Sequence, residues 1–315
     1  MPALLENLAR CRHSRARRCV QTLHRSIGWL NDDDAYMSAF TFFAVLAAAL
    51  LHVCWNALIK NSVSKLTSML IMTLVQGGFG AVIALTQQFP EASVWFPWLL
   101  ASGAFHSAYK LFLVYAYEQG DLSRVYPIAR GGAPMLVLVI SVSVLTDPLG
   151  IKEFLGVLAL GIGILLMARG VFANGESRRL VPFALGSALM TAGYSIADGL
   201  GARISGDTVM YVAWLFILDA VFFTPICLAL RGRAVLRAEQ RDWALGSVAA
   251  AASYGAYAIV VWAMTQAPIA LVTALRETSI LFAVLIGWLV MGDSMDRSKG
   301  FAAALIVLGV VLTRI

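Results

Sequence analysis

Ten apolar stretches of about twenty residues constrain this chain more than any other feature of its sequence. A helix needs roughly 20 apolar residues to cross the hydrocarbon core of a bilayer, and inside that core the backbone must satisfy its own hydrogen bonds. The sequence therefore predicts an all-α integral membrane protein with ten transmembrane helices. The expected spans are 36–59, 66–86, 95–117, 124–146, 151–172, 180–202, 208–230, 242–264, 268–291 and 298–315.

Composition agrees with a membrane protein. Only 13% of the residues are charged and 60% are hydrophobic, whereas soluble domains are about 25% charged. Lys and Arg together number 24 against 18 Asp and Glu. In such a chain this excess is typical of basic cytoplasmic loops rather than of nucleic-acid binding. We therefore expect the lipid bilayer as a partner and no nucleic acid.

Two arginines stand inside otherwise apolar spans. Arg130 lies between Pro127 and Pro134, and Arg276 lies in the span expected at 268–291. A charge at bilayer depth costs roughly 2.5–3.5 kcal/mol on insertion scales, so it persists where a partner, water or a ligand meets it. The prolines remove backbone donors, so we expect a helix break there that lines a cavity. A buried arginine in each half predicts a transporter's binding site near the midplane.

The chain reads as two related halves, 36–172 and 173–315. Residues 114–119 are echoed by residues 261–266 at the end of the eighth expected span, and the two arginines occupy corresponding places downstream. Because each half contains an odd number of spans, the second half is expected to be inverted relative to the first. Two inverted five-helix repeats are typical of carriers that work by alternating access.

Four motifs carry a resemblance to a known family. They are Trp55-Asn56-Ala57-Leu58-Ile59-Lys60, Tyr126-Pro127-Ile128-Ala129-Arg130, Ala274-Leu275-Arg276-Glu277, and Leu289-Val290-Met291-Gly292-Asp293 followed by Gly300. In this order the chain resembles the ten-helix EamA-type members of the drug/metabolite transporter superfamily, from about residue 37 to the end. The resemblance implies transport of a small metabolite through a central cavity, without ATP hydrolysis, in the inner membrane of a bacterium. Many relatives carry basic residues after the second span, but residues 87–91 contain none.

Residues 1–35 differ from the rest of the chain, because they carry six arginines and no apolar run long enough to span. Two interpretations stay open: a basic tail or surface helix, or a mis-assigned start whose natural first residue is Met37. Basic residues after the odd-numbered spans favour a cytoplasmic position for those loops and termini outside. The arginines of residues 1–35 indicate the opposite, so the location of the termini is also open.

Arg130 and Arg276 are the first candidates for substrate binding. An inverted repeat would bring the two guanidinium groups together, where they could hold a carboxylate, phosphate or phosphonate. The resemblance favours this, since the superfamily's sugar-phosphate carriers place basic residues on the fourth and ninth helices. In the alternative, each arginine pairs with a buried acid, Glu277, Asp198 or Asp219, and only locks helices together.

Further candidates follow from helical spacing. Lys110 and His106 stack on one face of the third expected span, where Lys110 could read substrate charge or couple protons. The alternatives are a lysine paired with an acid or reaching the surface, and a hydrogen-bonded core histidine. The residues expected to shape the pocket, with core packing as the alternative, are Trp55, Asn56, Tyr126 and Tyr257. The candidates for proton or ion coupling are His52, His106, Asp198, Asp219 and Glu277.

These features predict a secondary transporter whose halves rock about a central site. The expected substrate is a small organic anion, an amino acid, or a phosphorylated or phosphonate compound. The rivals are a proton-coupled exporter of cations that uses the buried carboxylates, a membrane enzyme acting on a lipid-linked substrate, and a purely structural subunit. No glycine-rich loop ending in Gly-Lys-Ser/Thr occurs, which argues against an ATP-driven pump. We expect no enzyme activity, cofactor or metal, and leave direction, coupling ion and a homodimer open.

Overall fold

The computed structural model describes residues 37–60, 64–86, 95–119, 122–145, 147, 149–167, 179–291 and 297–314. Residues Ser38–Ile315 form one compact unit. The predictions for residues 1–35 lie outside the described residues and stay predictions.

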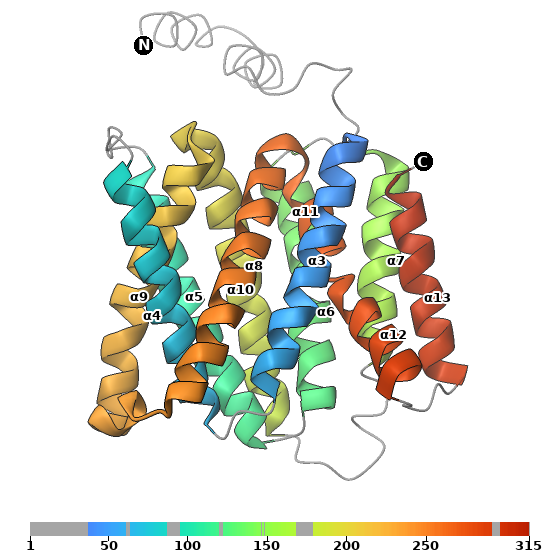
Figure 1. Ribbon diagram of the computed structural model, residues 1–315. Coiled ribbons are helices and arrows are strands. Elements are labelled where there is room, and N and C mark those ends of the chain that lie inside the picture. Colours follow the sequence, from blue (N-terminus) through green and yellow to red (C-terminus); the bar gives the residue numbers. More distant parts are fainter. Residues whose placement is uncertain are drawn as a thin grey trace, which may run out of the picture. The chain divides into compact units, whose positions relative to one another are not determined.

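Every regular element in the described ranges is a helix (Figure 1). In chain order they are α3 (Ala39–Lys60), α4 (Lys65–Thr86), α5 (Phe96–Gln119), α6 (Leu122–Ile140) with the π-helical turn η3 (Ser141–Leu145), α7 (Ile151–Met167), α8 (Leu180–Ser205), α9 (Thr208–Arg231) with the 3₁₀ turn η5 (Gly232–Leu236), α10 (Gln240–Gln266), α11 (Ile269–Arg276), α12 (Ser279–Met291) and α13 (Arg297–Leu312). Six segments are long and apolar enough to cross a membrane, in α3, α4, α8, α9, α10 and the joined α11–α12 stretch. The all-α membrane class is confirmed, whereas the count of ten spans and the inverted repeat stay predictions.

The outward faces of the helices carry large apolar side chains. Leu85 is 87% exposed, Phe40 74% and Ile151 72%. Exposed apolar side chains on helices of this length suit contact with lipid tails. The interior instead contains small residues together with buried polar and charged side chains.

Glycines allow two helices from opposite halves of the sequence to touch. A Cβ on Gly156 of α7 would lie 2.9 Å from the carbonyl oxygen of Gly309 in α13, and a Cβ on Gly309 would lie 2.7 Å from that of Gly156. Neither position accepts a side chain without moving the backbone. Small residues at helix crossings are the usual way for membrane helices to pack closely, and α7 and α13 lie side by side in Figure 1.

Contacts between helices of the two predicted halves come in matched pairs. Helix α5 packs on α8 as α10 packs on α3, and α5 meets α9 as α10 meets α4. Helix α6 contacts α8 in the same way that α11 and α12 contact α3. Helices α4 and α9 hold the same place in the two predicted halves and contact each other, and so do α7 and α13 (Figure 1). The two predicted halves are therefore joined by contacts between α3–α6 of the first and α8–α12 of the second.

The helix break does not lie where the prolines predicted it. Helix α6 runs without a gap through Pro127 and Pro134, so this structure shows no opening of the helix at these two residues. A proline removes one backbone donor, but in a membrane bundle neighbouring groups can satisfy the freed carbonyl without ending the helix. The irregular backbone of this segment comes later, in the π-helical turn at Ser141–Leu145.

The break falls instead in the ninth apolar stretch, which the sequence predicted as one span. Helix α11 ends at Arg276 and α12 begins at Ser279. Between them, the amides of Glu277 and Thr278 donate to the carbonyls three residues earlier, both at 3.1 Å. The Thr278 hydroxyl also donates to the Leu275 carbonyl at 2.7 Å. Tightened bonds of this kind satisfy the end of a helix, so Arg276 and Glu277 stand where the backbone changes course.

Candidate substrate site

A cavity lies between helices of the two predicted halves. It brings together eight of the residues singled out from sequence: His52, Trp55, His106, Lys110, Arg130, Asp219, Tyr257 and Arg276. The remaining lining residues are Ala48, Met72, Gln76, Tyr109, Tyr194, Phe216, Ser253, Ala256 and Val260. These residues come from α3, α4, α5, α6, α8, α9, α10 and α11, so both predicted halves build the cavity.

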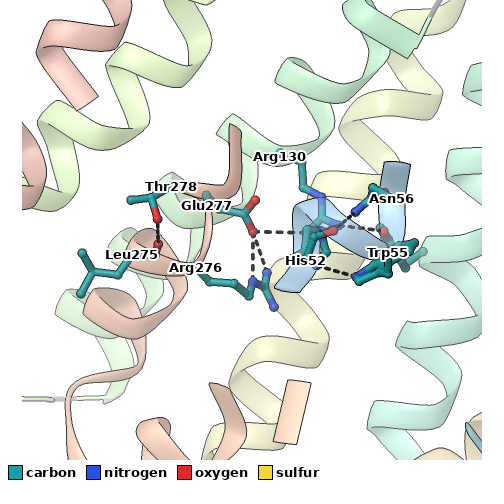
Figure 2. Close-up of polar contacts among 9 residues, drawn as sticks. His52, Trp55, Asn56, Arg130, Leu275, Arg276, Glu277 and Thr278 are labelled. Carbon is teal, nitrogen blue, oxygen red and sulfur yellow. Dashed lines mark hydrogen bonds and ion pairs between the residues drawn. The ribbon is translucent and has the colours of Figure 1, made fainter. Parts of the chain in front are cut away.

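The two arginines share a single carboxylate. Arg276 donates from Nε and Nη2 to Oε1 of Glu277, at 3.1 and 2.8 Å, and Nη1 of Arg130 lies 3.4 Å from the same oxygen. All three side chains are buried, with Glu277 wholly inaccessible. Figure 2 shows Glu277 between the two guanidinium groups. Both arginines therefore meet a buried acid, with two positive charges on one carboxylate, and substrate binding by them stays a prediction.

His52 joins Arg130 to the wall of the cavity. Its Nε2 lies 2.8 Å from Nη2 of Arg130, and its Nδ1 lies 3.2 Å from Nε1 of Trp55 (Figure 2). A neutral imidazole has one acceptor nitrogen, whereas the guanidinium and the indole can only donate. Only one of the two contacts is therefore a hydrogen bond at any moment. Arg130 and Trp55 compete for His52.

Lys110 forms an ion pair with Asp219 of α9. The ammonium also donates to the hydroxyl of Thr73 and lies 4.8 Å from the centre of the Phe223 ring. Asp219 is buried, and Lys110 keeps only a small exposed fraction where it lines the cavity. This is the paired alternative left open for Lys110, since one positive charge meets one negative charge.

Asp198 is fully buried behind the cavity wall. The hydroxyl of Tyr257 donates to its Oδ2, and Nε2 of His106 lies 3.1 Å from the same atom. The hydroxyl of Tyr211 reaches Oδ1 at 3.3 Å. Asp198 thus meets the cavity only through His106 and Tyr257, which both line it.

Aromatic rings form the walls between the charged groups. Tyr194 stacks on His106 with ring centres 4.0 Å apart, and Cζ of Arg276 lies 5.7 Å from the centre of the Tyr194 ring. Cζ of Arg130 lies 5.9 Å from the ring of Tyr109, whose hydroxyl is 3.3 Å from Nη2 of Arg130. Aromatic faces attract guanidinium groups. The cavity is therefore lined by aromatic rings that lie next to the two guanidinium groups.

Asn56, Tyr126 and Pro127 are predicted site residues that are not among the described residues lining the cavity. Asn56 does not line the cavity, because its amide donates to the His52 carbonyl one turn earlier at 2.7 Å, a local bond that asparagine often makes. The side chain of Asn56 is therefore held by its own helix, and its role in substrate binding stays a prediction. The side chain of Tyr126 lies outside the described residues, as does that of Pro127. Within the described ranges, no three His, Cys, Asp or Glu residues gather as metal ligands.

Sequence reasoning named neither Tyr109 nor Gln76 as site residues. Tyr109 stands three residues after His106 and directly before Lys110, so the same helical spacing could have found it. Gln76 lies among small and apolar residues of α4 and lines the cavity while buried. Nothing in the local pattern of α4 marks which face meets the cavity.

Comparison with models of known families gives a match to the EamA-like transporter family over residues 29–169 and again over residues 179–315. The two matches together cover most of the chain. The chain belongs to the EamA-like transporter family. The resemblance seen in the motifs is thereby confirmed, and the protein is an integral membrane transporter of small molecules.

Solved structures agree on the fold of this EamA-like chain. Twenty-nine chains match, and one of them, titled only as the crystal structure of a protein, superposes with a TM-score of 0.68. That alignment covers 87% of this chain and 98% of the other at 19% sequence identity. At this identity the likeness shows the shared fold and nothing of the substrate. Comparison with curated proteins finds no match.

Proposed function

We propose that this EamA-like transporter carries a small organic anion by alternating access, and that Arg130 and Arg276 hold the anionic group. The observation that carries the proposal is the imbalance at Glu277, where two buried guanidinium groups share one carboxylate oxygen. Two buried cations held this close repel each other, so negative charge brought near them is favourable. A carboxylate, sulfonate, phosphonate or phosphate arriving from the cavity would bring that charge and accept several hydrogen bonds from the two guanidinium groups.

The shape of the cavity supports a substrate with an apolar body. Tyr109, Tyr194, Tyr257, Trp55 and Phe216 surround the space next to the arginines. Aromatic and aliphatic walls with a few charged groups are typical of small-molecule sites, in which the polar groups fix orientation. The anionic group would lie at the arginines and the apolar part between the rings.

The proposed movement is a rocking of two inverted five-helix halves, with ten spans, in the inner membrane of a bacterium. Two observations support it: the family matches the chain twice in succession, and the contacts between the halves come in matched pairs. Such repeats place the site near the midplane, at their interface. That Arg130 comes from the first predicted half and Arg276 from the second supports the proposal.

The cation-exporter alternative finds less support in the contacts. Glu277 already faces two arginines, Asp219 is paired with Lys110, and Asp198 accepts from tyrosines and faces His106. A cationic substrate would have to displace one of these partners. Oε2 of Glu277, which has no hydrogen-bond partner among the described residues, is an acceptor on the carboxylate that both arginines contact. An amino acid could use it for its ammonium group while the arginines hold the carboxylate.

The test is thermal stabilisation of the purified protein by ligands that share a phenyl body and differ in charge. The panel is benzenesulfonate, phenylphosphonate, phenylalanine and benzyltrimethylammonium. A ligand that binds only the folded state raises the melting temperature. At a concentration 100 times its Kd, it adds about 2.7 kcal/mol to the free energy of unfolding. We expect benzenesulfonate to stabilise the wild type and the exposed-arginine control Arg233→Gln, but neither Arg130→Gln nor Arg276→Gln. Stabilisation by benzyltrimethylammonium alone, unchanged in the two variants, would contradict the proposal.

A further inference from the structure

We infer that the cavity binds one proton together with the anion, and that the His106–Asp198 pair is the site of that proton. The inference rests on the proposed function, since it concerns what accompanies the anion at the arginines. It identifies the transporter as a carrier that moves an anion and a proton in the same direction, so that no net charge crosses the membrane.

The first step is the balance of charge around the cavity. Three cationic and three anionic groups line it or directly contact a lining residue in the described part of the chain: Lys110, Arg130 and Arg276 against Asp198, Asp219 and Glu277. With both histidines neutral, these charges cancel. A bound monoanion would leave the cavity with one negative charge at membrane depth, where a lone charge is costly. One added proton restores the balance.

Of the two histidines that line the cavity, His106 takes the proton. His52 is excluded by its neighbour, because its Nε2 lies 2.8 Å from Nη2 of Arg130, a group that always donates. A proton on that nitrogen would face a positive guanidinium. His106 has the opposite environment, since its Nε2 lies 3.1 Å from Oδ2 of the fully buried Asp198. A protonated His106 is paired where a protonated His52 would be repelled.

The remaining groups around His106 leave this choice intact. From α8 it meets Tyr194 and Asp198, and from α10 it meets Tyr257, while Tyr211 of α9 contacts Asp198. On its own helix, Lys110 lies one turn further on and is neutralised by Asp219 of α9. The other charged or titratable groups at the cavity are His52 on α3, Tyr109 on α5, Arg130 on α6, and Arg276 with Glu277 at the end of α11. The polar residues that α4 contributes, Thr73 and Gln76, carry no charge. Among the described residues, Asp198 is therefore the one carboxylate in direct contact with His106.

Binding of the proton and binding of the anion are linked across Tyr194. Tyr194 lies between the two sites, with its ring centre 4.0 Å from that of His106 and 5.7 Å from Cζ of Arg276. A unit charge about 10 Å away changes proton binding roughly tenfold at an effective dielectric constant of about 20. By reciprocity, protonation of His106 strengthens anion binding by the same factor. The anion and the proton therefore bind cooperatively across one aromatic ring.

The experiment uses benzenesulfonate, which stays an anion at every working pH and so cannot carry the proton itself. Its Kd is measured by calorimetry on the full chain in detergent between about pH 5.5 and 8.5, the range in which histidine titrates. Because the anion-bound state holds more protons, affinity should fall roughly tenfold from the acidic to the alkaline end. A pH indicator in weakly buffered solution should report uptake of up to about half a proton per bound anion for a coupling of this size.

The variants separate the proton site from the anion site. In His106→Gln the affinity should no longer depend on pH and proton uptake should vanish, whereas His52→Gln should keep the pH dependence whatever its affinity. Asp198→Asn is a second variant that removes the counter-charge, for use if His106→Gln does not fold. The melting temperature of each variant without ligand shows whether it is folded.

The outcomes are distinguishable. If benzenesulfonate binds wild type through the arginines with equal affinity at every pH and without proton uptake, the inference is wrong and the anion site stands. If proton uptake persists in His106→Gln, the proton binds elsewhere and the inference is wrong as well. If neither benzenesulfonate nor phenylphosphonate binds at any pH, the proposed function fails before the inference is reached.

Discussion

Two clusters of charge face the same cavity and differ in their balance. Around Lys110 one ammonium meets one carboxylate, and the pair joins α5 to α9. Around Glu277 two guanidinium groups meet one carboxylate at the break between α11 and α12. In our proposal the Lys110–Asp219 pair holds helices together, whereas the two guanidinium groups at Glu277 also bind the anion. The comparison of the two clusters tests whether a buried charge that is already paired one to one takes part in binding.

The largest effect that separates the two clusters is expected on anion affinity. Arg276→Gln should weaken benzenesulfonate binding roughly 100-fold, because removing one partner of a buried, hydrogen-bonded charge pair costs about 2–5 kcal/mol. The equivalent change Lys110→Gln should weaken it several-fold at most. Calorimetry at one pH measures both. Arg276→Lys is the matched control and should fall between, since lysine keeps the charge and loses the bidentate fork.

Equal losses in Arg276→Gln and Lys110→Gln would remove the distinction between the clusters. In that case Lys110 would contact the substrate, as the sequence first suggested, and Asp219 would be its resting partner. A loss in Lys110→Gln alone would place the anion at α5 and α9.

The second prediction concerns transport by protein reconstituted in phospholipid vesicles. An imposed difference of one pH unit should accumulate benzenesulfonate roughly tenfold on the alkaline side, because one unit is worth 1.36 kcal/mol for a 1:1 carrier. A potassium diffusion potential of either sign should leave the rate unchanged, since no net charge moves. His106→Gln should let the anion equilibrate without accumulating. Accumulation that follows the electrical potential would contradict the electroneutral cycle.

The third prediction compares the stability of the two clusters. Lys110→Met should lower the melting temperature clearly, because it leaves Asp219 buried and unpaired at a cost of about 3–5 kcal/mol. Adding Asp219→Leu should restore most of the loss, since an apolar pair can replace a buried ion pair. The same treatment at the other cluster, Arg276→Met with Glu277→Leu, should not recover, because Arg130 then loses its carboxylate. Thermal unfolding in detergent without ligand measures all four variants.

The sequence predicted the helices and most of the cavity, for reasons that are local. Apolar runs of bilayer length specify membrane helices wherever they occur, and a charge inside such a run has to face the interior. That argument found Arg130, Arg276, Lys110 and Asp219. It could not say that one carboxylate would serve both arginines, because this depends on how α6 and α11 meet.

The backbone break shows the limit of local reasoning most clearly. Proline is the strongest helix breaker in sequence terms, yet α6 passes through both prolines, and the chain turns at Glu277 and Thr278, where neither proline nor glycine occurs. Glu277 is held at this turn by contacts with Arg276 and Arg130 from two helices. The side chain of Asn56 shows the opposite case, since it has a hydrogen-bond partner within its own helix.

The smallest effect tests the competition for His52 at the edge of the cluster around Glu277. Trp55→Phe removes the indole donor and keeps an aromatic ring, so His52 can accept from Arg130 without a rival. Arg130 is then held more firmly away from the substrate, and benzenesulfonate affinity should fall about two- to tenfold, which corresponds to one hydrogen bond of about 0.5–1.5 kcal/mol. His52→Phe should act in the opposite direction by releasing Arg130, and calorimetry on both variants at one pH measures the difference. A gain of affinity in Trp55→Phe would mean that the indole blocks the anion, and that the wall of the cavity limits binding more than the state of Arg130.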